Sequence, residues 1–119
     1  MGLYGKNNLF TTLDVSYNPD LKLFHCGGNQ LTTLDVSSNT ALTVLDCSLN
    51  QLTSLDVSNN IHLGTAGWMF IDHNLEGLII SGMPTLEEVC VWELPFPPDG
   101  VPVDTMGSPN VYFTTECSK

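Results

Sequence analysis

The sequence predicts a mostly β fold, a solenoid in which short parallel strands stack coil upon coil. The first observation behind this prediction is a 21-residue period, with FTTLDV at residues 10–15, LTTLDV at 31–36 and LTSLDV at 52–57. The second observation is that apolar residues and asparagines keep the same phase through these copies. A short fixed period indicates a stacked repeat, because each coil can bury its apolar side chains only against its neighbours.

Written as LxxLxVSxNxxLxxLxCxxNQ, the repeat places equivalent residues one coil apart, about 4.8 Å if the strands pair. Six inward ladders follow, one for each of these sets of equivalent positions: Phe10, Leu31, Leu52 and Leu75; Leu13, Leu34, Leu55 and Leu78; Val15, Val36, Val57 and Ile80; Leu21, Leu42, Leu63 and Leu86; Leu3, Phe24, Leu45, Trp68 and Val89; Gly5, Cys26, Cys47, Phe70 and Val91. The step from Leu52 to Leu75 is two residues too long, and we place the extra residues in a bulge at Gly64–Gly67.

Two sets of asparagines recur beside the apolar ladders, at Asn8, Asn29 and Asn50 and at Asn18, Asn39 and Asn60. A buried asparagine at a turn can bond backbone groups of its own coil and of the next one. We therefore expect these side chains to satisfy the backbone at each corner of the coil.

The repeat divides the chain into a solenoid of about four coils at residues 1–94 and a C-terminal cap at residues 95–119. The cap begins where prolines replace the repeat, and it ends with an apolar strand at residues 111–113. Nothing comparable precedes Leu3. This open start indicates either a fragment of a longer repeat protein or a natural short form whose N-terminal coil pairs edge to edge with another chain.

Composition excludes several classes of partner. The net charge is −10, with three lysines and no arginine, so the basic surface that nucleic-acid binding requires is missing. The sequence has no signal peptide and no apolar run long enough for membrane insertion. The acidity suits solubility outside the cell or a partner with basic residues.

The four cysteines fall into two kinds. Cys26 and Cys47 occupy equivalent inward positions, so we expect buried free thiols. Cys90 occupies an outward position equivalent to Asp46, and Cys117 lies in the cap. A disulfide between Cys90 and Cys117 would fasten the cap to the last coil and would indicate an oxidising compartment.

Strand alternation predicts which side chains face outward on the sheet formed by the second half of each repeat. A protein or peptide partner would contact these residues, and large apolar and aromatic side chains would be the anchors. Thr33 and Ser54 lie on the opposite side of the coil. The alternative is a spacer segment that binds nothing specific. The predicted binding residues are Tyr4, Leu23, His25, Val44, Asp46, Met69, Ile71 and Trp92.

Evidence for catalysis or metal binding is weak. His25 and Asp46 are neighbours in the predicted sheet, but two ligands do not make a zinc site. The row formed by Asp14, Asp35 and Asp56 either binds a cation such as calcium or stays solvated beside its serines and threonines. No phosphate loop, HExxH or GxSxG motif is present. We expect no catalytic residues, no metal and no cofactor.

The segment LTVLDCSLNQL at residues 42–52 matches LxxLxCxxNxL, the pattern of the leucine-rich repeat family. Residues 3–93 resemble a bacterial subclass with 21-residue units, an extended convex side and a C-terminal cap. The resemblance implies a right-handed parallel solenoid that binds its partner on the concave sheet and carries no chemistry. It also implies an exported protein, extracellular or at the cell surface, and it supports the Cys90–Cys117 disulfide.

Overall fold

The computed structural model describes residues 2–5, 7–64, 77–94, 96 and 103–117. Within these residues the regular structure is entirely β, and no helix is present. The strands are β1 (Gly2–Tyr4), β2 (Leu23–His25), β3 (Val44–Asp46), β4 (Ser54–Asp56), β5 (Leu78–Ile79), β6 (Glu88–Cys90), β7 (Val103–Asp104) and β8 (Tyr112–Thr114).

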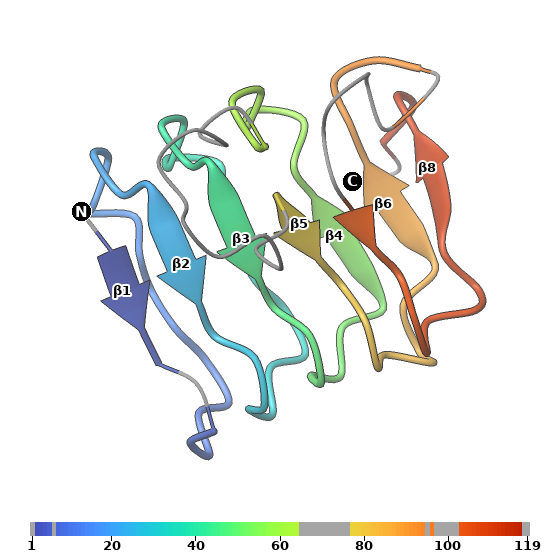
Figure 1. Ribbon diagram of the computed structural model, residues 1–119, viewed down its shortest axis with the longest axis horizontal. Coiled ribbons are helices and arrows are strands. Elements are labelled where there is room, and N and C mark those ends of the chain that lie inside the picture. The colour runs from blue at the N-terminus through green and yellow to red at the C-terminus, as the bar shows by residue number, and fades with distance from the viewer. Residues whose placement is uncertain (1, 6, 65–76, 95, 97–102, 118–119) are drawn as a thin grey trace.

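The strands form two parallel sheets, and from β3 onward successive strands alternate between them. The first sheet has the order β1-β2-β3-β5-β7, and the second has the order β4-β6-β8. In Figure 1 the strands β1, β2 and β3 follow one another across the molecule, and β6 and β8 continue the second sheet beyond β4. This parallel, coil-by-coil path is a β-solenoid, as the 21-residue period predicts.

The core lies between the two sheets and consists of the inward ladders. Phe24, Leu45 and Leu78 occupy adjacent positions of the first sheet, and all three are completely buried. Leu55 and Val89 are adjacent in the second sheet and are also buried. Side chains of equal position therefore stack directly, which gives the solenoid one continuous apolar core.

The corner asparagines satisfy backbone groups as predicted. The Nδ2 group of Asn50 donates to the carbonyls of Cys26 and Cys47, at 3.1 and 3.0 Å. Its Oδ1 accepts from the backbone N–H of Leu31 at 3.0 Å. Asn29 makes the equivalent bonds one coil earlier. Each of these asparagines thus ties two coils together where the backbone turns.

The register expected after residue 64 is wrong. The sequence pattern places Leu78 beside Leu55, and it places Val89 in the ladder of Leu45 with Trp68 between them. In the structure, Leu78 lies beside Leu45 and Val89 lies beside Leu55. The two halves of the repeat, LxxLxVxxN and LxxLxCxxN, carry almost the same apolar pattern. A shift of half a coil therefore keeps every inward position apolar, and the pattern alone does not detect it.

Gly64 and Gly77 mark the place where the shift arises. A Cβ added to Gly77 would lie 2.7 Å from the backbone of Gly64, so these two glycines are in direct contact. Gly64 also donates its backbone N–H to Thr43, and Gly77 accepts from Leu45. Leu63-Gly64 followed by Gly77-Leu78 therefore traces the same path as Leu42–Leu45. The 12 residues between the glycines lie outside the described part of the chain.

Residues 103–114 extend both sheets by one more strand each. β7 pairs with β5, and β8 pairs with β6, each in parallel. The first sheet has five strands, as the five-membered ladder that begins at Leu3 predicts, but its last two strands are β5 and β7. A domain boundary at residue 94, a distinct cap and the right-handed sense remain predictions.

Candidate functional site

The outer face of the first sheet displays a row of side chains in strict register. Tyr4 lies beside His25, His25 beside Asp46, Asp46 beside Ile79, and Ile79 beside Asp104. The order of residues that we predicted for this row is correct for its first three members, Tyr4, His25 and Asp46. Its fourth and fifth members, Ile79 and Asp104, replace Met69 and Cys90, which the shifted register had placed there.

The exposed end of this row is an aromatic stack. The rings of Tyr4 and His25 lie 5.0 Å apart and only 12° from parallel, and Tyr4 is 68% exposed. His25 Nδ1 lies 3.7 Å from the Oδ2 atom of Asp46. Asp46 thus holds the imidazole from one side while Tyr4 covers its face, and together they form a flat aromatic platform at β1 and β2.

Two of the predicted contact residues are buried. Val44 and Asp46 are only 1% and 3% exposed, so β3 is covered on both of its faces. Asp46 accepts hydrogen bonds from the backbone N–H and the hydroxyl of Ser48, at 3.1 and 2.7 Å. These bonds satisfy one carboxylate oxygen without solvent. Among the predicted residues of this sheet that the structure describes, Tyr4 is therefore the exposed one, with Leu23 and His25 half-buried beside it.

Trp92 lies away from this surface, which corrects its expected place on the concave face. It follows β6, and β6 belongs to the second sheet. Its ring packs edge-on against Phe96, with centroids 5.2 Å apart, and the pair is packed against the core. Met69 and Ile71 lie outside the described residues.

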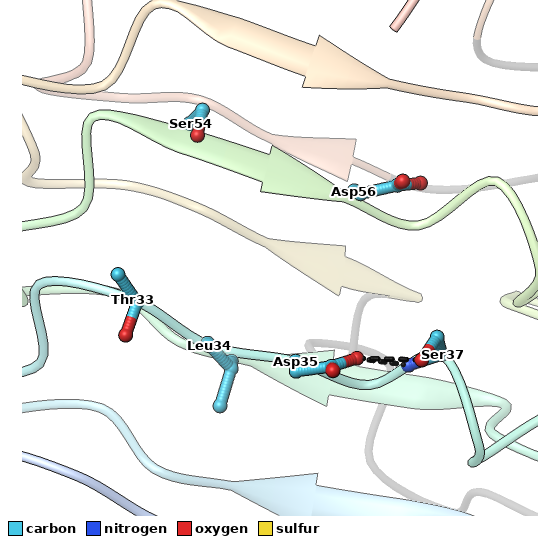
Figure 2. A pocket seen from close by; sticks show the side chains of 6 residues that line it. All are labelled: Thr33, Leu34, Asp35, Ser37, Ser54 and Asp56. Atoms are coloured by element: carbon cyan, nitrogen blue, oxygen red, sulfur yellow. Dashed lines mark hydrogen bonds between the residues drawn. The ribbon is translucent and has the colours of Figure 1, made fainter. Parts of the chain in front are cut away.

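The opposite side of the coils carries two shallow grooves that the sequence did not predict. The larger has a volume of about 330 Å³ and lies between residues 33–37 and β4. Figure 2 shows that its lining side chains come from these two neighbouring segments: Thr33, Leu34, Asp35, Ser37, Ser54 and Asp56. The second groove, of about 260 Å³, lies one coil earlier, between residues 12–16 and 33–38. Residues 13–15 and 34–36 form no strand pairs, so adjacent coils leave a hollow there.

The aspartates along these grooves are engaged within their own turns. Asp14, Asp35 and Asp56 each accept two hydrogen bonds from the serine two residues later, one from its hydroxyl at 2.6 Å and one from its backbone N–H at 2.9 Å. The bonds from Ser16 hold the pKa of Asp14 below its ordinary value. Burial and the neighbouring charge of Asp35 act in the opposite direction and offset part of this lowering. The aspartate row therefore has a structural role in closing each turn.

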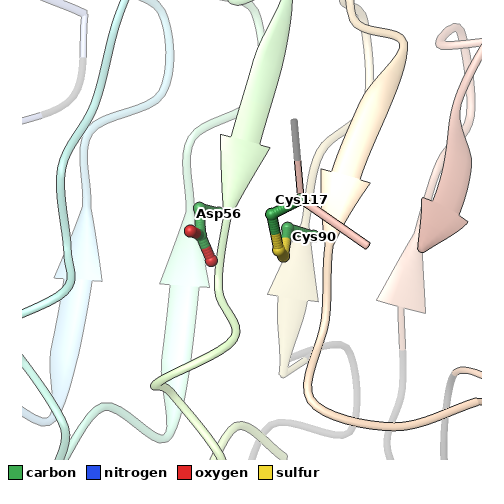
Figure 3. Close-up of side chains that lie close together, drawn as sticks. All are labelled: Asp56, Cys90 and Cys117. Carbon is green, nitrogen blue, oxygen red and sulfur yellow. A yellow bond between two sulfur atoms is a disulfide. The ribbon is translucent and has the colours of Figure 1, made fainter. Parts of the chain in front are cut away.

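The predicted disulfide is confirmed: Cys90 and Cys117 are bonded, with their Cα atoms 5.5 Å apart. Cys90 lies in β6 beside Asp56, and not in the outward row of Asp46 where the expected register had it. Figure 3 shows Asp56 next to the two sulfurs, and the three potential ligand atoms lie within 4.8 Å of one another. Both sulfurs are bonded to each other, and this disulfide fastens the C-terminal segment to the second sheet.

The other two cysteines are buried free thiols, as predicted. Burial raises the pKa of Cys26 to about 12, and the nearby charge of Asp46 adds to this effect. Burial also raises the pKa of Cys47, with further contributions from Cys26 and Asp46. Both thiols therefore stay protonated near neutral pH, and they serve as small apolar residues of the core.

Sequence reasoning missed Ile79 and Asp104 on the outer face and the two grooves on the opposite side. The pattern holds no signal for Ile79, since SGMPT after Ile80 resembles the turn after Val57 no better than the turn after Cys47. The grooves have no such signal, because they depend on the spacing between coils. No helix among the described residues has the length and apolar character needed to cross a membrane.

Comparisons with known proteins support the fold. No protein-family model matches the sequence, and no curated protein matches it. Among solved structures, the functional domain of InlJ from Listeria monocytogenes, which includes a cysteine ladder, is similar over 99% of this chain, with a TM-score of 0.57 and 23% sequence identity. The chain covers 30% of that protein's chain. At this identity the similarity shows the fold alone, and the fold of this chain is a leucine-rich-repeat-like β-solenoid.

Proposed function

We propose that this chain is a non-enzymatic protein-interaction module of an exported bacterial protein, and that it binds a protein or peptide through the outer face of its first sheet. The observation that carries the proposal is the exposed Tyr4 ring stacked on His25. An ordered aromatic side chain loses little conformational entropy on binding and presents a large apolar area, which is why such residues dominate protein interfaces.

Two further properties favour a protein or peptide with basic residues. The chain carries a net charge of −10, and Asp104 is half-exposed in the same outer row as Tyr4. Opposite charges across an interface accelerate association and make it sensitive to salt. Export is supported by the Cys90–Cys117 disulfide, since disulfides persist in oxidising compartments.

The alternative is a structural spacer within a larger surface protein, whose sheet binds no specific ligand. The buried Val44 and Asp46 favour this alternative, because they reduce the accessible surface in the middle of the sheet. The two proposals differ in one measurable respect. A spacer selects no binding sequence, whereas an interaction module selects peptides that depend on particular outer-face residues.

A displayed library of random peptides, selected against the immobilised chain, tests the proposal. Selected peptides should be rich in lysine or arginine, and their association rate should fall as salt concentration rises. Tyr4→Ala should weaken binding by about 2 kcal/mol, a typical value for an aromatic anchor. Thr33→Ala on the opposite side is the matched control and should leave binding unchanged. Equal losses in both variants, or failure to select any peptide, would favour the spacer.

A further inference from the structure

Three side chains that can bind a metal ion meet on the outer side of the second sheet. Asp56, Cys90 and Cys117 each bring one potential ligand atom, and these atoms all lie within 4.8 Å of one another. Figure 3 shows the Asp56 carboxylate beside the two sulfurs. The pairing of β4 with β6 places Asp56 next to Cys90. The three residues form no closely spaced motif in the sequence, which is why the sequence alone predicts no metal.

Cys90 changes the chemistry of a row that is otherwise acidic. Asp14, Asp35 and Asp56 stand at equivalent positions of three successive coils, and Cys90 is the next member of this row, paired with Asp56. A row of carboxylates offers oxygen alone, which suits hard cations such as calcium. Cys90 and Cys117 change the donor set to two thiolates and one carboxylate. Thiolate ligands select zinc over calcium and magnesium.

The carboxylate of Asp56 is already held in one orientation. Ser58 donates two hydrogen bonds to its Oδ1 atom, one from the hydroxyl at 2.6 Å and one from the backbone N–H at 2.9 Å. Supporting bonds of this kind fix the direction of a metal ligand and strengthen metal binding. Both bonds go to Oδ1, so Oδ2 is the oxygen that a metal ion would take.

The spacing of the donor atoms suits a tetrahedral ion. With zinc–sulfur bonds of about 2.3 Å, two sulfurs on one tetrahedral zinc ion lie about 3.8 Å apart. The Cα atoms of Cys90 and Cys117 are 5.5 Å apart, and Cys117 follows the end of β8 and is half-buried. Once its sulfur is released from Cys90, a shift of the Cys117 side chain therefore reaches this arrangement. Three protein ligands leave the fourth position to water.

The site is open to solvent on the side of Asp56. This residue also lines the larger groove, which has a volume of about 330 Å³, and both Asp56 and Cys117 are half-buried. A metal site needs such an entry path, since the ion must reach its ligands after the chain has folded.

The disulfide and the metal complex are alternative states of the same two sulfurs. A water-soluble phosphine breaks the Cys90–Cys117 bond by two-electron reduction and is itself oxidised to the phosphine oxide. Water supplies the oxygen of the oxide and the protons of the two new thiols. A zinc ion then displaces these two protons and binds the thiolates. Either link fastens the C-terminal segment to β6.

We propose that Asp56, Cys90 and Cys117 form a redox-controlled zinc site, which binds the ion in the reduced chain and is closed by the disulfide in the oxidised chain. The site needs no protein partner, so it goes beyond the proposed function and is tested independently of it. Because zinc binds the folded chain through residues of separate strands, it should restore part of the stability that reduction removes.

Cobalt(II) is the probe, because it takes the same tetrahedral sites as zinc and its thiolate complexes absorb light. The purified 119-residue chain is reduced with the phosphine, separated from the reductant in the absence of oxygen, and titrated with cobalt. One ion per chain should bind and give thiolate-to-cobalt charge-transfer bands, which zinc should then remove. The oxidised chain should show no such bands. Zinc should also raise the thermal midpoint of the reduced chain.

Asp56→Asn removes one ligand and should weaken zinc binding to the reduced chain by about tenfold or more. Asp35→Asn is the matched control, since Asp35 accepts the same two bonds from its own serine one coil earlier. The double variant Cys26→Ala and Cys47→Ala removes the buried thiols and should bind cobalt like the parent. Circular dichroism establishes that each variant is folded.

Absence of charge-transfer bands from the reduced parent overturns the proposal, as does equal cobalt binding by the oxidised chain. Undiminished binding by Asp56→Asn, or an equal loss in Asp35→Asn, also overturns it, because the carboxylate of Asp56 is then no ligand. Loss of the bands in the double variant would place the metal at Cys26 and Cys47 and overturn it as well.

Discussion

The described parts of residues 2–64 and 77–117 contribute strands to the same two sheets, but they differ in the spacing between strands and in the side chains that bond the backbone at the corners. In the first region, strand positions recur every 21 residues and asparagines hold the corners, as at Asn29 and Asn50. In the second region the steps are 25 residues from Leu78 to Val103 and 24 from Val89 to Phe113. At its corners Ser108 accepts a bond from Met83 N–H and donates one to Ile80.

The comparison teaches which features of the repeat are indispensable. Both regions keep the inward apolar residues in register, and both satisfy the backbone at the corner. The spacing between strands and the side chain that holds the corner both vary. In the second region Ser108, and not an asparagine, bonds the backbone at this corner. The same region also contains the Cys90–Cys117 disulfide. The inward ladders are therefore the shared requirement, and the first prediction tests them.

Leu45→Ala should produce the largest loss of stability, about 4 kcal/mol, because it empties a completely buried position between Phe24 and Leu78. Leu3→Ala removes the same atoms from the same ladder at the exposed end of the sheet, and should cost less than half as much. Urea denaturation followed by circular dichroism measures both. Equal losses would mean that the two ends of the ladder are equally buried.

Removal of the disulfide should have the next largest effect and should be confined to the second region. Cys90→Ala with Cys117→Ala opens a link across 27 residues and should cost about 3 kcal/mol. Addition of a dithiol reductant to the parent chain should lower its stability by the same amount and leave the double variant unchanged. A reductant effect on the double variant would contradict the assignment of Cys26 and Cys47 as free thiols.

Deletion of residues 65–76, which joins Gly64 directly to Gly77, should change stability by no more than about 2 kcal/mol, the closure entropy of a loop of this length. The structure brings the two glycines into contact, and the deletion restores the 21-residue step from Leu45 to Leu78. The register expected from sequence gives the opposite result, because there Trp68, Phe70 and Leu75 are core residues. Non-cooperative urea unfolding of the deletion variant would support that register.

The smallest effect concerns the two buried thiols of the first region. At pH 8 the native chain should show no reaction with iodoacetamide, since the pKa of Cys26 is raised to about 12 and that of Cys47 is also raised. The denatured, unreduced chain should show two reactive thiols. The native state holds these thiol protons more tightly than the unfolded state. Their contribution to stability is therefore complete below the usual pKa of 9.0 and is lost as pH rises towards 12.

Mass spectrometry of labelled peptides distinguishes the outcomes. Four reactive thiols in the denatured chain would refute the disulfide. Rapid labelling of the native chain at Cys26 or Cys47 would show that the core of the first region opens readily.

The sequence by itself determined the solenoid, its inward ladders up to Leu63, the corner asparagines and the sorting of the four cysteines. Each of these follows from a local pattern that repeats with a fixed period, so the residues of one coil predict the equivalent positions of the next coil. It also determined the outer row from Tyr4 through Asp46, because strand alternation fixes which side chains face outward.

The tertiary structure decided the register after Gly64, and with it the place of every later strand. The two halves of the repeat carry nearly the same apolar pattern, so the pattern is compatible with Leu78 beside Leu45 or beside Leu55. In the structure Leu78 lies beside Leu45, and Gly64 is in contact with Gly77. That choice moves Trp92 to the second sheet and brings Ile79 and Asp104 to the outer face. Burial of Val44 and Asp46 was likewise shown only by the tertiary structure, since strand alternation places both on the outer face.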